Sequence, residues 1–303
     1  MPMSYNVYVR SRDGVRLHAS CHGESHRPAL VLVHGYPDNA QVWTPLIAEL
    51  LSDFYIIAYD VRGAGQSDTP RRWRDYRLAR LAEDLQCVVD ELLPGRSFHL
   101  AAHDWGSIQS WESVTGEVLA QRLLSFTSIS GPCLDHASFW LRRQLTRQPR
   151  QVLDQLLHSW YIFLFHAPGL AEGVWHLLLA PLWPRVRQMS DGIVDAPSQQ
   201  QLHDALHGIA LYRANFISRL LRPRRRRATC PVQVILPHSD AFVRPQLVDG
   251  LQRWVAELYV RDVQGGHWII HAQPRLIAAM IRDFALGIDA GQLKAELLTA
   301  RVH

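Results

Sequence analysis

The chain has 303 residues, of which 48% are hydrophobic and 20% are charged. This balance excludes a disordered or fibrous protein, and the length suits one large α/β domain with an insertion or two modest domains. The formal net charge of +4 is arginine-rich, but a basic balance without a nucleic-acid motif is weak evidence for a nucleic-acid-binding protein.

Neither a leader nor a membrane-spanning segment is apparent. Residues 1–14 hold no apolar segment after a basic start, so no secretory signal is expected and a cytoplasmic location is the default. The most apolar stretch, residues 156–183, is interrupted by histidines, a glutamate and Pro168-Gly169, and falls short of the ~20 apolar residues of a spanning helix. We expect helices that line an apolar space, while contact with a lipid surface stays open.

The first part of the chain alternates strand-like and helix-like segments. The segments at residues 5–10 and 15–23 alternate apolar and polar side chains around Asp13-Gly14, which predicts a hairpin. Helices are expected near residues 42–51 and over 77–93, where leucine and valine recur at helical spacing. Continuous apolar runs predict strands buried on both faces at residues 29–35, 54–60, 97–102 and 123–130.

A block of helices then interrupts the alternation. From Cys133 to about Arg222 the apolar pattern is helical only. Strand-like and helical segments resume at residues 231–237, 256–260 and 275–286. The sequence therefore predicts one α/β core domain, built from residues 1–132 and 223–303, with a helical cap at residues 133–222.

Two further features carry little chemistry. The run of arginines at residues 222–227 is interpreted as a solvated linker, the alternative being contact with an anionic surface. The cysteines lack the spacing of a metal or redox site and are expected to be reduced packing residues; they are Cys21, Cys87, Cys133 and Cys230.

Residues 101–106, "AAHDWG", have the pattern of a nucleophile elbow. Such a sharp strand-to-helix turn needs small residues two positions before and two after the nucleophile, and Ala102 and Gly106 supply them. Asp104 stands where a serine hydrolase carries its hydroxyl. An aspartate that simply caps a helix is an equally good interpretation of this segment alone.

Other candidates also follow strands, where an open parallel sheet binds its ligands. In "HGYP", the turn can aim the Tyr36 N–H at the elbow, where the Trp105 N–H would complete an oxyanion hole, or it can be an ordinary turn. "GGHW" places His267 after the last strand, and "PHSD" offers Asp240 as its orienting acid, with Asp135 as a second source. The order nucleophile, acid, histidine is that of α/β-hydrolases.

The loop "DVRGAGQSD" at residues 60–68 also contains charged side chains. We interpret Asp60, Arg62 and Asp68 as structural residues of a tight glycine-rich loop. The candidate catalytic set therefore excludes them.

A carboxylate nucleophile suits a particular reaction. An aspartate with a pKa of ~3.9 is ionised at neutral pH, so it can attack a saturated carbon directly and form an alkyl ester. The histidine would then activate water against that ester, and the oxyanion hole would stabilise the charge on the aspartate's own oxygen.

The leaving group distinguishes an epoxide from a haloalkane. A halide leaves as a stable anion, whereas the alkoxide of an opening epoxide needs an acid, and a protonated phenol can supply one. The predicted cap contains two tyrosines, Tyr161 and Tyr212, although cap tyrosines are more often packing residues. The cap core, with a few members lining an apolar tunnel, is expected to contain Trp160, Phe163, Phe165, Trp175 and Trp183.

Taken together, these segments resemble the α/β-hydrolase-fold epoxide hydrolases. The matching pieces, in family order, are "HGYPDNAQVW", "DVRGAGQSD", "AAHDWGS", "SWYIFLFHAPG", "LYRANF", "LPHSDAFV" and "GGHW". The chain is similar in particular to the hydrolase part of bacterial fusions in which an epoxide hydrolase precedes a short-chain dehydrogenase. Ala102 stands where the family usually has glycine, and Ser107 replaces a second small apolar residue; neither departure removes a chemical group.

The resemblance implies a fold, a site and a reaction. The fold would be an α/β-hydrolase fold, a mostly parallel twisted sheet flanked by helices with an inserted helical cap. The implied catalytic residues are Asp104 as nucleophile, His267 as general base, Asp240 as orienting acid, Tyr161 and Tyr212 as ring-opening acids, and Tyr36 with Trp105 as oxyanion hole. The substrate would contact Trp105, Tyr161 and Tyr212.

The implied reaction opens small apolar epoxides to vicinal diols with water and without a metal or other cofactor. Nucleic acid is not an expected partner, and a homodimer is compatible with the resemblance. One alternative is a haloalkane dehalogenase with the same Asp104 and His267, although Tyr36 stands where a halide-binding asparagine would. The other is a hydrolase-like binding module that uses the arginine run as its contact surface.

Overall fold

One sheet organises the computed structural model, which describes residues 4–194 and 199–302. In this part of the chain the strand order is β1-β2-β4-β3-β5-β6-β7-β8-β9, with parallel pairing from β4 to β8 and antiparallel pairing at both edges. The predicted mostly parallel α/β sheet is confirmed. The strands are β1 (Ser4–Arg10), β2 (Arg16–His22), β3 (Ala29–Val33), β4 (Tyr55–Tyr59), β5 (Phe98–His103), β6 (Leu123–Ile129), β7 (Val232–Pro237), β8 (Leu258–Val263) and β9 (Arg301–Val302).

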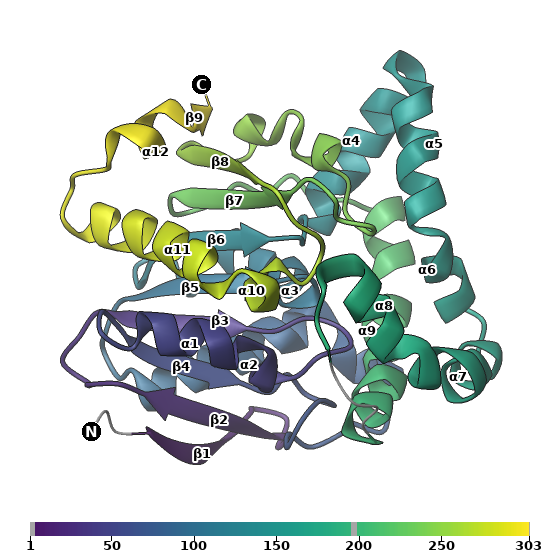
Figure 1. The fold of residues 1–303 in the computed structure, drawn as a ribbon, viewed down its shortest axis with the longest axis horizontal. Coiled ribbons are helices and arrows are strands. Elements are labelled where there is room, and N and C mark those ends of the chain that lie inside the picture. Colours follow the sequence, from purple (N-terminus) through teal and green to yellow (C-terminus); the bar gives the residue numbers. More distant parts are fainter. Residues whose placement is uncertain (1–3, 195–198, 303) are drawn as a thin grey trace.

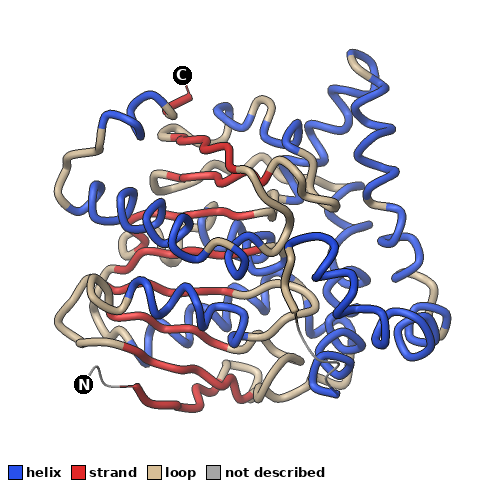
Figure 2. Tube along the Cα trace, in the orientation of Figure 1, coloured by secondary structure: helices blue, strands red, loops and turns tan. Residues whose placement is uncertain are grey.

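Helices cover both faces of the sheet (Figures 1 and 2). Helices α1, α10 and α11 pack together on one face, and α2 packs with α3 on the other. The core helices are α1 (Thr44–Leu50), α2 (Leu78–Leu92), α3 (Trp105–Val114), α10 (Ile269–Ala272), α11 (Pro274–Asp289) and α12 (Ala295–Thr299).

A helical insertion separates β6 from β7 and lies beyond the carboxyl ends of the parallel strands (Figure 1). Residues 195–198, inside the predicted cap, lie outside the described residues. In the described ranges, no helix combines the length and the apolarity needed to cross a bilayer. The insertion comprises α4 (Leu134–Arg147), α5 (Pro149–His158), α6 (Trp160–Phe165), α7 (Leu170–Val174), the turn Trp175–Leu179, α8 (Ala180–Asp191) and α9 (Gln199–Leu221).

The predicted strands all form, with small shifts at their ends. The largest shift is in β8, which we expect at residues 256–260 and which extends to Val263. Arg261 and Asp262 interrupt the apolar pattern there because this strand lies near the sheet edge, where a side chain reaches water. Strand β9 was not predicted, since two residues without an apolar run carry no periodic signal.

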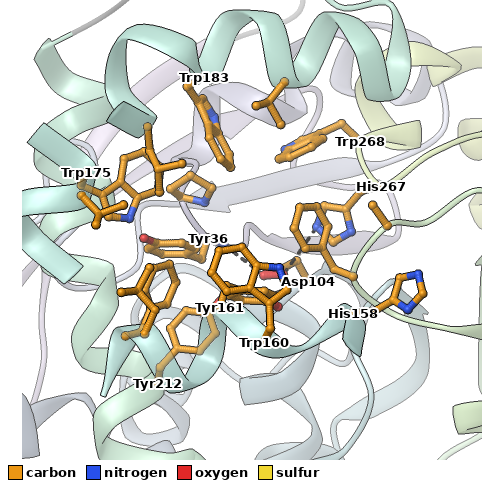
Figure 3. A pocket seen from close by; sticks show the side chains of 18 of the residues that line it. Tyr36, Asp104, His158, Trp160, Tyr161, Trp175, Trp183, Tyr212, His267 and Trp268 are labelled. Carbon is orange, nitrogen blue, oxygen red and sulfur yellow. Dashed lines mark hydrogen bonds and ion pairs between the residues drawn. The ribbon is translucent and has the colours of Figure 1, made fainter. Parts of the chain in front are cut away.

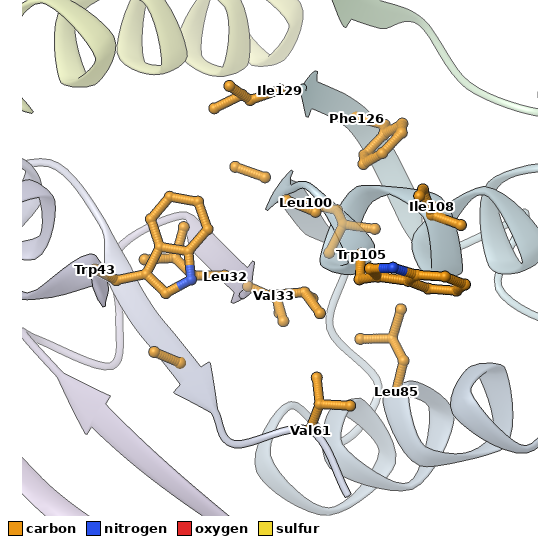
Figure 4. Close-up of a cluster of buried hydrophobic side chains, with 14 of the residues drawn as sticks. Leu32, Val33, Trp43, Val61, Leu85, Leu100, Trp105, Ile108, Phe126 and Ile129 are labelled. Atoms are coloured by element: carbon orange, nitrogen blue, oxygen red, sulfur yellow. The ribbon is translucent and has the colours of Figure 1, made fainter. Parts of the chain in front are cut away.

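The central strands are buried on both faces, which explains their continuous apolar runs. Every residue of β3, β4 and β5 is buried. Figure 4 shows Trp43 and Trp105 on either side of Leu32 and Val33, and all four side chains are inaccessible or nearly so. Burial on both faces requires parallel strands covered by helices, so the apolar runs and the layered fold have one cause.

The backbone between β5 and α3 forms a tight elbow. Asp104 has a φ of 49° and a ψ of −123°, a conformation that residues with a Cβ rarely adopt. Glycines allow the close approach of other backbone: a Cβ on Gly106 would lie 2.1 Å from the Val33 carbonyl oxygen, and one on Gly131 would lie 2.2 Å from the Asp104 carbonyl oxygen. Gly35 is equally confined, because its Cβ would lie 2.5 Å from that of Asp104.

Part of the arginine run is not the solvated linker that the sequence suggests. Arg224 and Arg226 pair with Glu112 of α3, and Arg224 also pairs with Asp135 of α4. Burial by itself would raise the pKa of Glu112, but the hydrogen bond from Arg224 and the nearby arginine charges lower it. The linker prediction was wrong for these two arginines because the acids that bind them are remote in sequence, whereas the other arginines of the run are exposed as expected. Arg224 and Arg226 fasten the end of the insertion to the core.

The confined elbow predicts that replacing Gly106 with alanine destabilises the fold. Gly106→Ala should lower the free energy of unfolding by more than ~2 kcal/mol, because the added methyl group meets backbone that cannot rotate away. The matched control is Gly173→Ala in α7, where a Cβ meets nothing within 4 Å; it should leave stability unchanged or raise it by up to ~1 kcal/mol. Urea denaturation of both variants gives the comparison, and equal stabilities would contradict the elbow argument.

Candidate active site

Four strand ends bring the predicted site residues together. Tyr36 follows β3, Asp104 follows β5, Asp240 follows β7 and His267 follows β8. Asp104, His267 and Tyr36 line one cavity together with the two tyrosines of the insertion (Figure 3). The carboxyl ends of parallel strands therefore meet where the sequence analysis expects them to meet.

Two backbone N–H groups converge on one oxygen of Asp104. Oδ2 accepts a hydrogen bond from Tyr36 N–H at 3.2 Å and another from Trp105 N–H, the first amide of α3. The elbow and the helix cap, proposed as alternatives for Asp104, are thus one geometry. Because Oδ2 is held in this way, Oδ1 is the oxygen left to react, and negative charge on Oδ2 is stabilised by donors and by the helix N-terminus.

His267 lies between two carboxylates. Its Nδ1 is 2.9 Å from Asp240 Oδ2, and its Nε2 is 3.5 Å from Asp104 Oδ1. Asp240 is 1% exposed, and its other oxygen accepts hydrogen bonds from the N–H groups of Phe242 and Val243 at 2.8 and 3.0 Å. Asp240 therefore holds the imidazole with Nδ1–H toward itself, which leaves Nε2 facing Asp104 and the cavity.

Charges oppose burial at both members of this pair. Burial alone would lower the pKa of His267, but the carboxylates of Asp240 and Asp104 raise it well above its usual value. Burial alone would raise the pKa of Asp240, but His267 and the two backbone N–H groups lower it. These shifts favour a protonated His267 beside an ionised Asp240, that is, a buried ion pair.

The alternative acid occupies another part of the molecule. Asp135 lies at the start of α4 and accepts hydrogen bonds from the backbone N–H and the guanidinium of Arg224. The carboxylate that accepts the hydrogen bond from His267 Nδ1–H belongs to Asp240 instead. Geometry thus favours Asp240 over Asp135 as the acid.

Contacts from the insertion restrain the loop that carries His267. A Cβ on Gly266 would lie 2.6 Å from Asp191 Oδ1, so helix α8 approaches the loop backbone closely. Trp268 donates its backbone N–H to Asp191 at 3.1 Å and its indole N–H to the buried Asp38 at 2.8 Å. Gly266 therefore makes room for the neighbouring helix α8.

The cavity above Asp104 is apolar and has a volume of about 370 Å³. Tyr161 and Tyr212 line it from the insertion, with their ring centroids 5.9 Å apart. A second cavity of about 190 Å³ is also lined by Asp104, Trp105 and the same two tyrosines. Asp104 and the tyrosines therefore stand between two apolar spaces.

Both phenols remain protonated across the ordinary pH range. Burial raises the pKa of Tyr161, and the negative charge of Asp104 raises it further. Burial also raises the pKa of Tyr212 well above its usual value, with added contributions from Tyr161 and Asp104. Each hydroxyl can consequently donate a hydrogen bond to an oxygen atom placed over Asp104.

Hydrogen bonds to the core hold the helix of Tyr212 in position. Asp204, two turns before it in α9, accepts hydrogen bonds from Asn39 Nδ2 at 2.8 Å and from Gly65 N–H at 2.9 Å. Asn215, three residues after it, accepts one from Leu78 N–H at 2.9 Å. Both side chains are buried, so the ring of Tyr212 is fixed over the elbow.

Of the five aromatic residues that were expected in the cap core, three are buried and two are exposed. Phe165, Trp175 and Trp183 are buried, whereas Trp160 is 63% and Phe163 70% exposed. The expectation that all five form the cap core was wrong for these two, because α5 and α6 lie on the outer side of the insertion. The members that line the larger cavity are Trp160, Phe165, Trp175 and Trp183.

Two residues that line the larger cavity were not predicted from the sequence. Phe242 packs its ring 4.8 Å from that of His267, and Trp268 packs 4.9 Å from the same ring. Each lies within two residues of a predicted catalytic side chain, and this proximity could have identified them.

The described ranges contain no group of three His, Cys, Asp or Glu side chains arranged to bind a metal ion.

Sequence comparisons place this geometry among known proteins. A family model described as the alpha/beta hydrolase fold matches residues 28–274. The Mycobacterium tuberculosis protein named probable oxidoreductase EphD is 36% identical over 305 residues, which cover 97% of this chain and 52% of that protein. The chain thus spans about half the length of this relative. Epoxide hydrolase 3 of Xenopus tropicalis is 26% identical over 297 residues, covering 91% of this chain and 77% of the relative.

Solved structures show the same fold. An epoxide hydrolase of Bacillus megaterium in complex with an inhibitor matches with a TM-score of 0.73 at 23% identity, covering 92% of this chain and 99% of that one. Cfl2 from Burkholderia cenocepacia matches with a TM-score of 0.75 at 22% identity, covering 93% and 95%. At these identities the likeness concerns the fold alone.

The ion pair at His267 predicts a defined pH dependence of stability. Because folding raises the pKa of His267, its stabilising contribution is complete below the unfolded value of ~6.5 and is lost as the pH rises through the folded value. Denaturant titrations of the wild type and of His267→Gln should give a stability difference that shrinks as the pH rises above ~6.5. A difference that stays constant over this range would contradict the raised pKa.

Proposed function

Because the chain belongs to the α/β hydrolase fold family and epoxide hydrolases are among its relatives, we propose that it is an epoxide hydrolase that converts apolar epoxides to vicinal diols. One observation carries this proposal. The nucleophile candidate Asp104 faces the phenols Tyr161 and Tyr212 across one apolar cavity, with His267 at its side. An ordinary ester hydrolase has no use for that combination, whereas an epoxide needs both a nucleophile and an acid.

In the first step, Asp104 Oδ1 attacks a ring carbon of the epoxide. The new bond joins that carbon to Oδ1, and the carbon–oxygen bond of the ring breaks. A phenol of Tyr161 or Tyr212 donates its proton to the departing oxygen, so the product is a hydroxyalkyl ester rather than an alkoxide. The hydrogen bonds from Tyr36 and Trp105 to Oδ2 support the orientation in which Oδ1 is the attacking atom.

In the second step, water attacks the carbonyl carbon of the Asp104 ester. His267 Nε2 takes the proton from this water, and the charge that develops on Oδ2 is stabilised by the two backbone N–H groups. The tetrahedral intermediate then expels the diol oxygen, which takes the proton held by His267. The second proton of the water passes from the Asp104 carboxyl group to the tyrosinate, so the phenol and the carboxylate are both restored. The oxygen of the water therefore stays in the Asp104 carboxylate, and the diol carries away the oxygen that was Asp104 Oδ1.

Alkylation itself prepares His267 for this second step. In the free enzyme the Asp104 charge contributes to the raised pKa of His267, which favours the protonated ring. Ester formation removes that charge, so the pKa of His267 falls and the neutral, basic ring becomes easier to form. The ring thus becomes a general base when the ester is present to be hydrolysed.

The proposal includes the organisation and surroundings of the enzyme. Residues 1–132 and 223–303 form the catalytic core, and residues 133–222 form the cap that supplies the acids. Side chains of this chain supply attack, protonation and water activation, so no cofactor has a part in the proposed steps. A cytoplasmic location and a homodimer stay predictions from the sequence.

The two-step mechanism predicts that His267→Gln stops the reaction at the ester. Incubation of this variant with a mixed library of apolar epoxides should add the mass of one substrate to the protein, because attack by Asp104 does not need the base. Intact-mass analysis followed by peptide mapping should locate the added mass on Asp104. The double variant Asp104→Ala with His267→Gln should gain no mass, and ester cleavage that survives Asp104→Ala would defeat the account.

The role of the phenols predicts a loss of alkylation in Tyr161→Phe with Tyr212→Phe. Without an acid for the ring oxygen, the single-turnover rate of ester formation should fall by about 10²- to 10⁴-fold. Tyr259→Phe, a buried tyrosine of β8, is the matched control and should keep the wild-type rate. If the double variant instead keeps its rate and releases chloride or bromide from haloalkanes, the dehalogenase alternative replaces the epoxide hydrolase.

A further inference from the structure

The outer side of the insertion exposes large apolar side chains in a row. Leu153, Leu156 and Leu157 are spaced three and one residues apart in α5, which puts them on the same side of that helix. The row continues along α6 and α7, which follow α5 down the outer side of the insertion in Figure 1. We call these residues the apolar stripe: Leu153, Leu156, Leu157, Trp160, Phe163 and Leu170, all between 41% and 70% exposed.

Single exposed leucines are ordinary on a protein surface, but a row of this kind is not. Large apolar side chains exposed side by side mark a place where a protein meets another apolar phase or an apolar partner. In α5 the opposite side, with Val152 and Gln155, is buried. The helix therefore already satisfies its contact with the core, and the exposed leucines are additional to it.

Both cavities beside Asp104 reach the surface at the apolar stripe. Leu157 and Trp160 are exposed and also line the larger cavity. Leu156 and Phe163 are exposed and also line the smaller one. Whatever covers the stripe consequently controls what enters the cavities. A protein partner on the stripe would close them, whereas a fluid apolar phase would leave them in contact with its solutes.

Positive charge adjoins the stripe at the turn between α4 and α5. Arg147 and Arg150 are exposed there. Arg253 and Arg147 lie near enough to Arg143 for their charges to lower its pKa, so this end of the insertion concentrates like charges. An anionic surface would relieve that repulsion.

We propose that the apolar stripe docks on the surface of an anionic lipid bilayer, with the arginines of the α4–α5 turn on the headgroups. Leucine, tryptophan and phenylalanine beside arginine are the composition of helices that lie in the bilayer interface. Docking would place the openings of both cavities against the acyl chains, so that an apolar substrate passes to Asp104 without crossing water. Only this delivery of an epoxide rests on the proposed function; the docking does not.

Vesicle flotation tests the docking. The wild type should float with vesicles of equal parts phosphatidylcholine and phosphatidylglycerol, float less at high salt, and float poorly with phosphatidylcholine alone. Leu153→Ser with Leu170→Ser, which line neither cavity, should weaken partitioning on the order of tenfold. Arg147→Gln with Arg150→Gln should weaken it by a similar factor, on the order of tenfold.

Matched controls use exposed residues of the core. Partitioning should stay unchanged in Leu276→Ser with Leu298→Ser, on α11 and α12. It should also stay unchanged in Arg71→Gln with Arg72→Gln, just before Trp73. The variants should all hydrolyse styrene oxide dissolved in water at the wild-type rate. A long-chain epoxide dissolved in the anionic vesicles should be hydrolysed about tenfold more slowly by Leu153→Ser with Leu170→Ser than by the wild type. Leu276→Ser with Leu298→Ser should hydrolyse it at the wild-type rate.

The outcomes separate docking from catalysis. Turnover of styrene oxide without vesicle binding overturns the docking and leaves the proposed function intact. Vesicle binding without turnover of any epoxide supports the docking and overturns the proposed function. A third outcome also overturns the docking: the wild type binds no vesicles and is a dimer in sedimentation equilibrium, whereas Leu153→Ser with Leu170→Ser is a monomer. The stripe would then be an interface between copies of the chain.

Discussion

The close approach of three backbone segments at Asp104 is the constraint on which the site depends. Gly35, Gly106 and Gly131 lie where a Cβ would overlap neighbouring backbone or the Asp104 side chain. Because the segments come this close, the N–H groups of Tyr36 and Trp105 reach one carboxylate oxygen. The positive φ of Asp104 is the local cost of that arrangement, and the buried strands on both sides hold it in place.

Electrostatics around His267 follows from the same placement. An imidazole buried among apolar rings would ordinarily be neutral, but here it lies between the carboxylates of Asp240 and Asp104. Asp240 is stabilised as an anion by two backbone N–H groups and does not depend on the cavity. Asp104 alone faces the cavity, so a reaction at Asp104 changes the charge that His267 experiences. Asp104 and His267 are therefore coupled through charge as well as through distance.

The helical insertion completes the site from outside the sheet. Its helix α9 is bound to the core through Asp204 and Asn215, which fixes Tyr212, and α8 contacts the loop of His267 through Asp191. Arg224 secures the end of the insertion on Glu112. The inner side of the insertion is thus held rigidly over Asp104, while its outer side carries the exposed apolar stripe. The insertion therefore supplies Tyr161 and Tyr212 on its inner side and the apolar stripe on its outer side.

Local sequence patterns by themselves determined the strands, the elbow and the order of the candidate residues. A strand buried on both faces needs a continuous apolar run, and an elbow needs small residues beside Asp104, so both leave a signal within a few positions. Tertiary structure alone decided which contacts form between distant segments. It pairs Arg224 with Glu112, selects Asp240 over Asp135 beside His267, and exposes Trp160 and Phe163 on the outer side of the insertion. No local pattern records these outcomes, because burial and charge pairing depend on neighbours that are remote in the chain, as Glu112 and Arg224 are, 112 residues apart.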